Sequence, residues 1–222
     1  ENRITPVATD TPVEFCALLG CGLSTALGVI NVEAKVKFGE SVMIVGAGGL
    51  GINLLRAATL ANAYPIISID IHNSKKKLAE SLGAHLFINA QTQNIEDELR
   101  KKFGIKEVDV IVETSGIKKA LESTIPLLSG VGRYIMVGQP KPGEGIELLN
   151  ANHLFGGVGK LIKATQGGAF SPSEDIPRYV KLHQAGILNI NNIITHRFPL
   201  DKINDAIDLV RKGQASRVLI KM

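Results

Sequence analysis

The sequence contains Ser41-Val-Met-Ile-Val-Gly-Ala-Gly-Gly-Leu-Gly51, and this stretch determines the expected fold. Its apolar residues 42–45 predict a buried parallel strand. Gly46, Gly48 and Gly51 then form a Gly-x-Gly-x-x-Gly pattern, and a helix rich in Leu and Ala is expected over 52–61. One glycine makes the tight turn, one lets the backbone approach a pyrophosphate, and one lets the helix pack on the strand. The helix N-terminus supplies free N–H groups and the positive end of its dipole to the phosphates.

A second strand, over 65–69, ends at Asp70, which follows Gly51 by 19 residues. At this distance a carboxylate hydrogen-bonds the ribose hydroxyls of NAD. The alternative is a purely structural turn followed by a surface aspartate. That alternative requires strand, glycines, helix and carboxylate to coincide without a ligand, so we predict a site for NAD.

The next part of the chain alternates strands with helices. We expect strands over 85–88, 108–112, 133–137 and 160–165, and helices over 74–82, 95–103 and 117–128. Such alternation predicts an α/β fold, a Rossmann-type doubly wound parallel sheet with helices on both faces. Ligands bind beyond the carboxyl ends of these strands. Gly46, Asp70, Thr114 and Gly138 all stand at such ends.

The composition excludes several classes of function. Apolar residues make up 45% and charged residues 21%, which is ordinary for a globular protein with a core. The net charge is only +4 and Trp is absent, so nucleic acid is an unexpected partner. No apolar run reaches membrane-spanning length, so no membrane contact is expected. Two cysteines without a Cys-x-x-Cys pattern are consistent with a reducing cytoplasm.

Both ends of the chain differ from this alternating pattern. Residues 15–34 predict two helices joined at Gly20-Cys21-Gly22, the second begun by Ser24 and Thr25. The last third predicts a helix over 175–185, an extended segment over 193–196, a helix over 201–211 and a strand over 217–220. We therefore expect a C-terminal α+β tail whose character differs from the alternating part.

Five stretches together carry a resemblance to a known family: Leu18–Thr25, Lys35–Gly51, Ile69–Ile71, Val112–Gly116 and the tail from Ile194 to Arg217. Through them the chain resembles the zinc-type alcohol dehydrogenases of the medium-chain dehydrogenase/reductase superfamily. The resemblance implies that the N-terminal catalytic domain is missing and that the tail belongs to that truncated domain. It also implies three parts: a connecting segment (1–22), an NAD-binding Rossmann domain (23–165) and the C-terminal segment of the catalytic domain (166–222).

The resemblance assigns roles to individual residues, each with a simpler structural alternative. The turn of Gly46, Gly48, Gly49, Leu50 and Gly51 is expected to cradle the pyrophosphate, and Asp70 to hold the adenosine ribose. The remaining cofactor-binding residues are expected near the ribose (Lys75), the nicotinamide end (Thr25, Thr114, Val137, Gly138, Gln139) and a phosphate (Arg217). The structural alternative for Lys75 is a solvated lysine at a helix start, and for Thr25 a hydroxyl at a helix start. For Val137, Gly138 and Gln139 it is a strand end with its turn, and for Arg217 a surface arginine.

Cys21 matches a ligand of the catalytic zinc, whereas Cys16 has no counterpart and is expected to fill the core. A catalytic zinc needs three protein ligands. The five histidines are scattered, and none receives a catalytic role. We therefore expect zinc only in the intact parent, an accessible thiol at Cys21, and no dehydrogenase activity from this chain alone.

The resemblance implies that the intact parent passes a hydride between an alcohol and NAD, with zinc as the Lewis acid. One alternative is a zinc-type polyol or sugar dehydrogenase, and another is a non-catalytic NAD-binding module. Because the chain begins at Glu1 without Met, we interpret it as a fragment or a trimmed chain.

We also expect a homodimer through the sheet edge at 160–165. The alternative is that Gly156-Gly157 and nearby lysines blunt this edge in a monomer.

Overall fold

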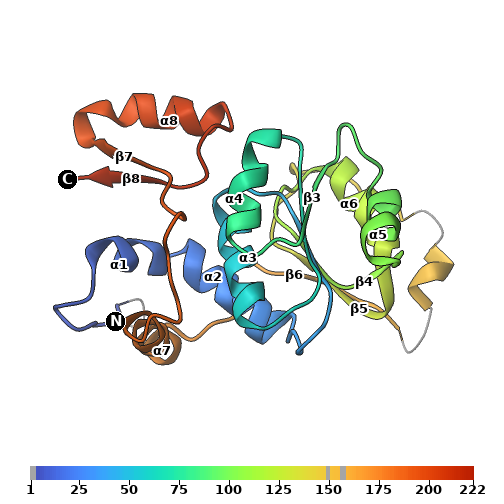
Figure 1. The fold of residues 1–222 in the computed structure, drawn as a ribbon, viewed down its shortest axis with the longest axis horizontal. Coiled ribbons are helices and arrows are strands. Elements are labelled where there is room, and N and C mark those ends of the chain that lie inside the picture. Colours follow the sequence, from blue (N-terminus) through green and yellow to red (C-terminus); the bar gives the residue numbers. More distant parts are fainter. Residues whose placement is uncertain (1–3, 149–150, 156–158) are drawn as a thin grey trace.

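The computed structural model describes residues 4–148, 151–155 and 159–222, and its centre is a six-stranded parallel sheet (Figure 1). The strand order is β3-β2-β1-β4-β5-β6, the order of a Rossmann sheet. The strands are β1 (Val42–Val45), β2 (Ile66–Asp70), β3 (Leu86–Asn89), β4 (Val108–Glu113), β5 (Leu128–Met136) and β6 (Leu161–Ala164). The predicted α/β fold class is confirmed.

Helices cover both faces of this sheet. Successive residues of β1 alternate: Val42 and Ile44 join one buried cluster, while Met43 and Val45 join another. The first cluster includes side chains of α1 (Val13–Leu19), α2 (Gly22–Gly28), the π-helical turn η1 (Val29–Glu33), α3 (Gly49–Leu60) and α4 (Lys76–Ser81). The second includes side chains of α5 (Ile95–Phe103), α6 (Lys118–Thr124) and the 3-10 turn η3 (Ile125–Leu127). The sheet is therefore a middle layer, buried on both sides.

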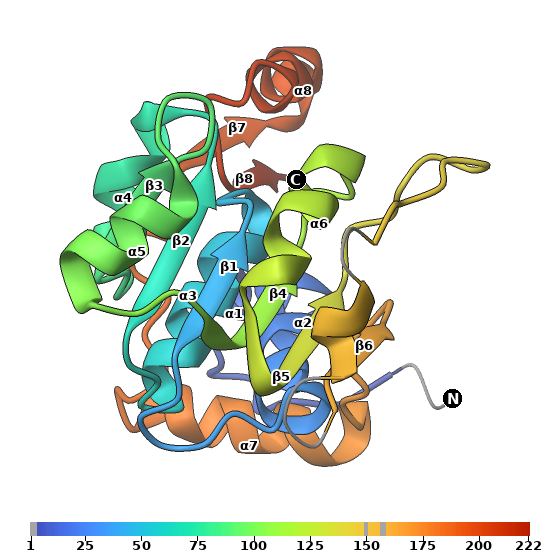
Figure 2. The same ribbon diagram turned by 90° about the vertical axis from the view of Figure 1, so that its right-hand side faces the viewer.

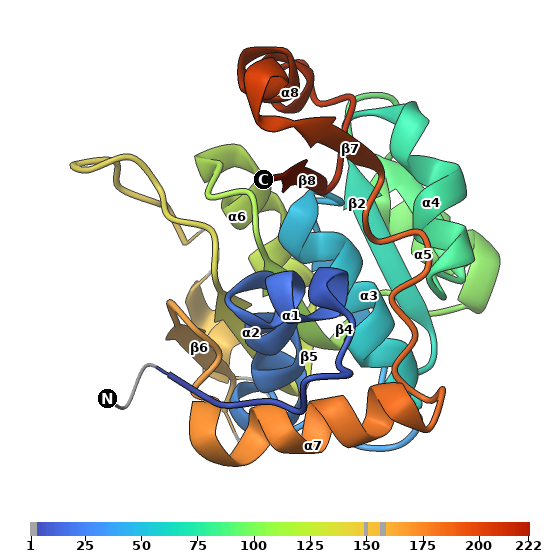
Figure 3. The ribbon, with the colours of Figure 1, turned by 90° about the vertical axis from the view of Figure 1, so that its left-hand side faces the viewer.

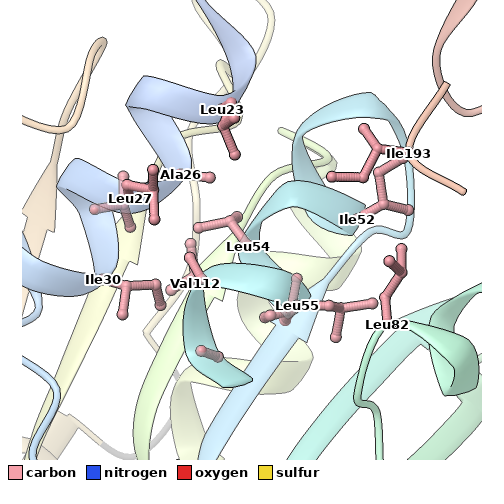
Figure 4. Packing of buried hydrophobic residues seen from close by; sticks show 14 of the residues in the cluster. Leu23, Ala26, Leu27, Ile30, Ile52, Leu54, Leu55, Leu82, Val112 and Ile193 are labelled. Carbon is pink, nitrogen blue, oxygen red and sulfur yellow. The ribbon is translucent and has the colours of Figure 1, made fainter. Parts of the chain in front are cut away.

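The N-terminal helices pack closely against the helix that follows the glycine turn. In Figure 4, Leu23, Ala26 and Ile30 lie opposite Leu54 of α3, and Val112 of β4 lies beneath them. All five are at most 2% exposed. Burying a large apolar side chain contributes about 1.5–3 kcal/mol. This packing holds the start of α2 close to the N-terminus of α3.

The C-terminal tail packs on the core through its first helix and carries a separate two-stranded sheet. It consists of α7 (Pro172–Gln184), β7 (His196–Pro199), η5 (Leu200–Lys202), α8 (Ile203–Arg211) and β8 (Val218–Lys221), and β7 pairs with β8 in parallel. Figures 1 and 3 show β7, β8 and α8 apart from the main sheet, with α7 at the opposite end of the molecule. An ion pair between Arg197 and Glu14, at 2.6 Å, joins β7 to α1. The expected C-terminal α+β tail is confirmed.

Several element boundaries differ from the predictions for a physical reason. The helix expected over 117–128 ends at Thr124, because Pro126 lacks an N–H and restricts the residue before it; β5 already begins at Leu128. Ile193 and Ile194 are not in a strand but are buried in the core, and β7 begins only at His196. The helix predicted over 74–82 begins only at Lys76, because the 3-10 turn η2 (Asn73–Lys75) precedes α4.

Two further points concern the edge beyond β5 and the N-terminal helices. The 3-10 turn η4 (Ala151–Phe155) precedes β6 and had no sequence signal, while Gly156-Gly157 lies outside the described residues. Among the described residues no single helix is long and apolar enough to cross a membrane. The bent pair Val13–Leu19 with Gly22–Glu33 passes that test by length and composition. Most of its large apolar side chains belong to the core cluster, whereas Val13 is exposed.

Candidate cofactor site

The glycine turn after β1 is built by close backbone contacts. Gly46 has a φ of 96°, and a Cβ there would stand 2.5 Å from the Thr114 hydroxyl oxygen. That hydroxyl donates to the Val45 carbonyl at 2.8 Å, so Thr114 fixes the turn from the neighbouring strand β4. A Cβ on Gly51 would lie 1.8 Å from the Gly46 carbonyl oxygen. Gly46 and Gly51 are therefore required by the fold itself.

Gly48 differs from the other two glycines because a Cβ there would meet nothing within 4 Å. It caps α3, which begins at Gly49, three residues before the predicted start. The first N–H groups of this helix, including those of Gly49 and Leu50, have no partner inside the helix. An open approach to a helix N-terminus fits a phosphate group. The turn thus offers a cradle that a side chain would fill.

Asp70 ends β2 beside this turn. One carboxylate oxygen accepts from the Ala47 N–H at 2.8 Å, and the other accepts from the His72 N–H at 2.9 Å. Each oxygen retains a further lone pair, since an ionised carboxylate offers about four acceptor sites. Asp70 is therefore held in position by the glycine turn and keeps the capacity to accept from ribose hydroxyls.

Lys75 lies under the tail. It is only 7% exposed, and its Nζ donates to the Ala215 carbonyl at 3.2 Å and to the Ser216 hydroxyl at 3.3 Å. The alternative of a solvated helix-start lysine is wrong. Burial lowers the pKa of Lys75, and the nearby carboxylate of Asp70 opposes that shift. His72 also faces the tail, because its Nε2 would lie 3.1 Å from a Cβ on Gly213.

Arg217 brings the tail to the glycine turn. Its guanidinium lies within 3.7 Å of the positions that Cβ atoms would take on Gly22 and Gly49. Thr195 holds the segment in place, since its hydroxyl donates to the Arg217 carbonyl at 3.0 Å. Figure 2 shows β7, β8 and α8 beyond the ends of β1 and β2. Arg217 is half-buried and lines a cavity of about 400 Å³ together with Gly49, so it is not simply a surface arginine.

The ends of β4 and β5 form a second close-packed turn. The N–H groups of Val137 and Gly138 donate to the Glu113 carbonyl, at 2.8 and 2.9 Å. A Cβ on Gly116, where φ is 64°, would lie 2.5 Å from the Gln139 carbonyl oxygen. The predicted residues Val137, Gly138 and Gln139 are thus brought against the segment from Thr114 to Gly116.

Glu113 organises this second turn, a role that we did not assign from the sequence. Its side chain is fully buried, and one carboxylate oxygen accepts from the Ser115 N–H at 2.6 Å and the Gly116 N–H at 3.1 Å. The sequence pattern that could have indicated this role is a carboxylate at the end of an apolar strand, followed by small polar residues. A buried charge of this kind requires several hydrogen bonds.

Thr25 and Cys21 lie on the N-terminal helices. Thr25 is buried inside α2, which begins at Gly22, so Ser24 and Thr25 do not start the helix. Cys21 is exposed, as expected, at the position just before α2. Cys16 is half-buried rather than a core residue, and it lines a cavity with Phe170 and Ile176.

The residues on this chain do not make a zinc site. Within residues 4–148, 151–155 and 159–222, no group of three or more His, Cys, Asp and Glu side chains could hold a metal ion. A catalytic zinc takes three protein ligands. Cys21 alone therefore does not fit that group.

The glycine turn, Asp70 and the Rossmann strand order define a dinucleotide-binding type of domain, and comparisons with known proteins identify its family. The model of the zinc-binding dehydrogenase family matches residues 49–185. Alcohol dehydrogenase 1 of Trifolium repens is 30% identical over 221 residues, which cover 99% of this chain and 57% of that protein. S-(hydroxymethyl)glutathione dehydrogenase of Paracoccus denitrificans is 29% identical over 227 residues, with 99% and 60% covered.

A solved structure gives the same result. Benzyl alcohol dehydrogenase from Acinetobacter calcoaceticus superposes with a TM-score of 0.91 at 31% identity, covering 100% of this chain and 60% of that one. The chain belongs to the zinc-binding dehydrogenase family, of the medium-chain alcohol dehydrogenase type. It spans less than two thirds of the length of these relatives.

Proposed function

We propose that this chain is the NAD-binding portion of a zinc-dependent alcohol dehydrogenase. The observation that carries the proposal is the convergence of three groups on one place: the open N-terminus of α3 at Gly48, the carboxylate of Asp70 and the guanidinium of Arg217. The helix N-terminus supplies unpaired N–H groups, Asp70 accepts hydrogen bonds, and Arg217 pairs with a phosphate. Together they match the pyrophosphate and ribose of NAD.

Each predicted residue has a role in this proposal. Gly46, Gly48, Gly49, Leu50 and Gly51 cradle the pyrophosphate. Asp70 accepts from the adenosine ribose, and Lys75 lies beside it. The remaining residues act near the nicotinamide end or the phosphates: Thr25, Thr114, Val137, Gly138, Gln139 and Arg217. When bound, NAD accepts the hydride, while the residues of this chain orient the cofactor and exclude water.

We propose the same three parts that the family resemblance implies, namely 1–22, 23–165 and 166–222. In the intact parent the tail would return to the catalytic domain. The parent would oxidise an alcohol to an aldehyde or ketone, and this chain alone would have no such activity. Cys21 would contribute one zinc ligand in the parent and bind no metal here.

Two other functions remain as alternatives. One is a zinc-type polyol or sugar dehydrogenase, which would differ from a simple alcohol dehydrogenase in its substrate pocket. The other is an NAD-binding module without catalysis. A Cys-x-x-His-type zinc motif in the upstream sequence of the native gene product would favour the enzyme, whereas its absence would favour the module. We also propose that the protein acts in the cytoplasm.

The edge strand β6 supports a homodimer. It pairs only with β5 among the described strands, so one side of its backbone is unpaired. Two copies related by a two-fold axis would join their sheets through β6.

Calorimetric titration of the chain with NAD tests the central proposal. We expect one NAD per chain and weaker binding by an Arg217→Ala variant, because the guanidinium beside Gly49 is lost. An Arg211→Ala variant is the matched control, since Arg211 is exposed on α8, where it pairs with Asp208. Equal affinity in both variants would remove Arg217 from the site, and no NAD binding by the unchanged chain would contradict the proposal.

A further inference from the structure

A buried carboxylate joins the end of β6 to the N-terminal helices. Glu33, the last residue of the π-helical turn η1, is only 8% exposed. One of its carboxylate oxygens accepts from the Thr165 hydroxyl at 3.0 Å, and the other forms an ion pair with the Lys163 ammonium. Figure 3 shows β6 beside α2, the helix that continues into η1. Glu33 therefore links this strand to the helix that carries Thr25.

Thr165 also links β6 to two other segments. Its N–H donates to the Met136 carbonyl at 2.9 Å, at the end of β5 and immediately before Val137. Its hydroxyl oxygen accepts from the Gly168 N–H at 3.1 Å. A hydroxyl group has one donor and two acceptor positions, so it can donate to Glu33 and accept from Gly168 at the same time. Thr165 is thus the point where Glu33, β5 and the turn at Gly168 meet.

The turn at Gly168 packs directly on the backbone of α2. Gly168 has a φ of 75°, and a Cβ there would lie 2.5 Å from the Thr25 carbonyl oxygen and 2.7 Å from the Val29 nitrogen. A Cβ on Gly28 would lie 2.4 Å from the Gly168 carbonyl oxygen. Glycine permits this close approach of two backbones because it carries no side chain. A shift of the turn would therefore be passed directly to Thr25.

The charge of Glu33 makes the link between η1 and β6 specific. A buried carboxylate is costly unless it is paired and hydrogen-bonded, and both partners of Glu33, Lys163 and Thr165, come from the end of β6. If the strand moved away from η1, the carboxylate would lose both partners together. The backbone of η1 is also irregular, because the Ala34 N–H donates to the Val29 carbonyl five residues earlier, at 2.8 Å. Single π-helical turns of this kind are frequent at functional sites.

We propose that Glu33 and Thr165 are positioning residues for the nicotinamide end of the cofactor. They act through Thr25 and Val137, which belong to two segments that their hydrogen bonds hold together. The inference rests on the proposed function, because Thr25 and Val137 are expected beside the nicotinamide only if the chain binds NAD. The adenosine half of the cofactor is expected elsewhere, at the glycine turn and Asp70, which lie at the ends of β1 and β2. Loss of the link should therefore weaken the binding of the nicotinamide ring and spare the adenosine half.

The test compares the binding of NADH and of ADP-ribose, which shares every part of the dinucleotide except the nicotinamide ring. A Thr165→Val variant keeps the size of the side chain and removes the hydroxyl. It should bind NADH about three- to tenfold more weakly, and ADP-ribose within about twofold of the unchanged chain. A Thr165→Ser variant restores the hydroxyl and should recover NADH binding. The fluorescence of the bound reduced ring should move toward that of free NADH in Thr165→Val and return in Thr165→Ser.

Thr124→Val is the matched control. Thr124 is buried as well, and its hydroxyl lies 2.8 Å from the hydroxyl of Tyr134, which belongs to the core cluster on the other face of the sheet. This variant loses a buried hydroxyl far from α2 and should bind both ligands as the unchanged chain does. A Glu33→Gln variant, which keeps the size of the side chain and removes the charge, provides the same comparison if Thr165→Val does not fold. It too should weaken NADH more than ADP-ribose.

Equal weakening of NADH and ADP-ribose by Thr165→Val and by Glu33→Gln would overturn the inference, since the link would then have only a general structural role. Equal affinity of the unchanged chain for the two ligands would also overturn it, because the nicotinamide ring would not be held. In both cases the binding of ADP-ribose would leave the proposed cofactor site intact. An unchanged chain that binds neither ligand would contradict the proposed function itself.

Discussion

Replacing two glycines of the same turn by alanine should have opposite consequences. In Gly51→Ala the new methyl group would stand 1.8 Å from the Gly46 carbonyl oxygen, which is backbone and has little freedom to move. In Gly48→Ala the methyl group would meet nothing within 4 Å, and the backbone φ of −78° suits alanine. The first change should damage the fold, whereas the second should damage only cofactor binding.

The structure sets the size of both effects. Real Cβ atoms essentially never come closer than 3.0 Å, so Gly51→Ala forces α3 away from β1 by more than an ångström. Overpacking of this kind costs about 3 kcal/mol at the upper end of its usual range. For a chain of this size that corresponds to a Tm lowered by about 6–12 °C. Gly48→Ala should change stability by less than about 0.5 kcal/mol.

The assay pairs thermal denaturation with NAD titration. Gly48→Ala should keep its Tm within about 2 °C. It should bind NAD about tenfold more weakly or worse, a loss of about 1.4 kcal/mol. A Gly51→Ala variant as stable as the unchanged chain would refute the packing argument. A Gly48→Ala variant with unaltered NAD affinity would refute the claim that this opening receives the cofactor.

Three further predictions concern other parts of the molecule. Burial raises the pKa of Glu33, but hydrogen bonds from Lys163 and Thr165 outweigh burial and hold that pKa below the ordinary value. The stability that the Glu33 carboxylate contributes is therefore present above about pH 4.3 and is lost as the pH falls through the lowered pKa. The Tm difference between the unchanged chain and Glu33→Gln should therefore shrink in acid, and an equal difference at pH 7 and pH 3 would contradict this. Elemental analysis should find no stoichiometric zinc in the chain, and a Cys21→Ser variant should be identical; zinc retained by the chain would show that it forms a metal site without the catalytic domain. Sedimentation at micromolar concentration should show a dimer paired through β6, and only monomer would count against it.

The sequence predicted elements with strong local signals best. The strand at Val42–Val45 and the helix at Ile95–Phe103 were predicted to the residue. The helix has a local cap, because the Asn94 side chain accepts from the Asp97 N–H, and it ends at Gly104 with a φ of 71°. Hydrophobic pattern and capping are local, so a single sequence carries them.

The parts that could not be predicted depend on contacts between distant residues. Lys75 was predicted to lie near the ribose, but its burial could not be predicted, because the tail that buries it comes 140 residues later. The role of Glu113 could not be predicted either, because it depends on the turn at Val137–Gly138, which is distant in the sequence. The segment at Ile193–Ile194 has a strand-like composition, but its side chains are buried in the core and it forms no strand.

The most direct test of the central claim is calorimetric titration of this chain with NAD and with NADP. Asp70 is fixed by the Ala47 and His72 N–H groups at the end of β2, where its carboxylate would accept from ribose hydroxyls and repel a 2′-phosphate. Lys75 to Lys77 are cations that could favour that phosphate, and His72 lies beside them, but the Lys75 ammonium is directed to the tail. We predict one NAD bound per chain and NADP bound at least about tenfold more weakly. Tighter binding of NADP, or no binding of either dinucleotide, would contradict the account.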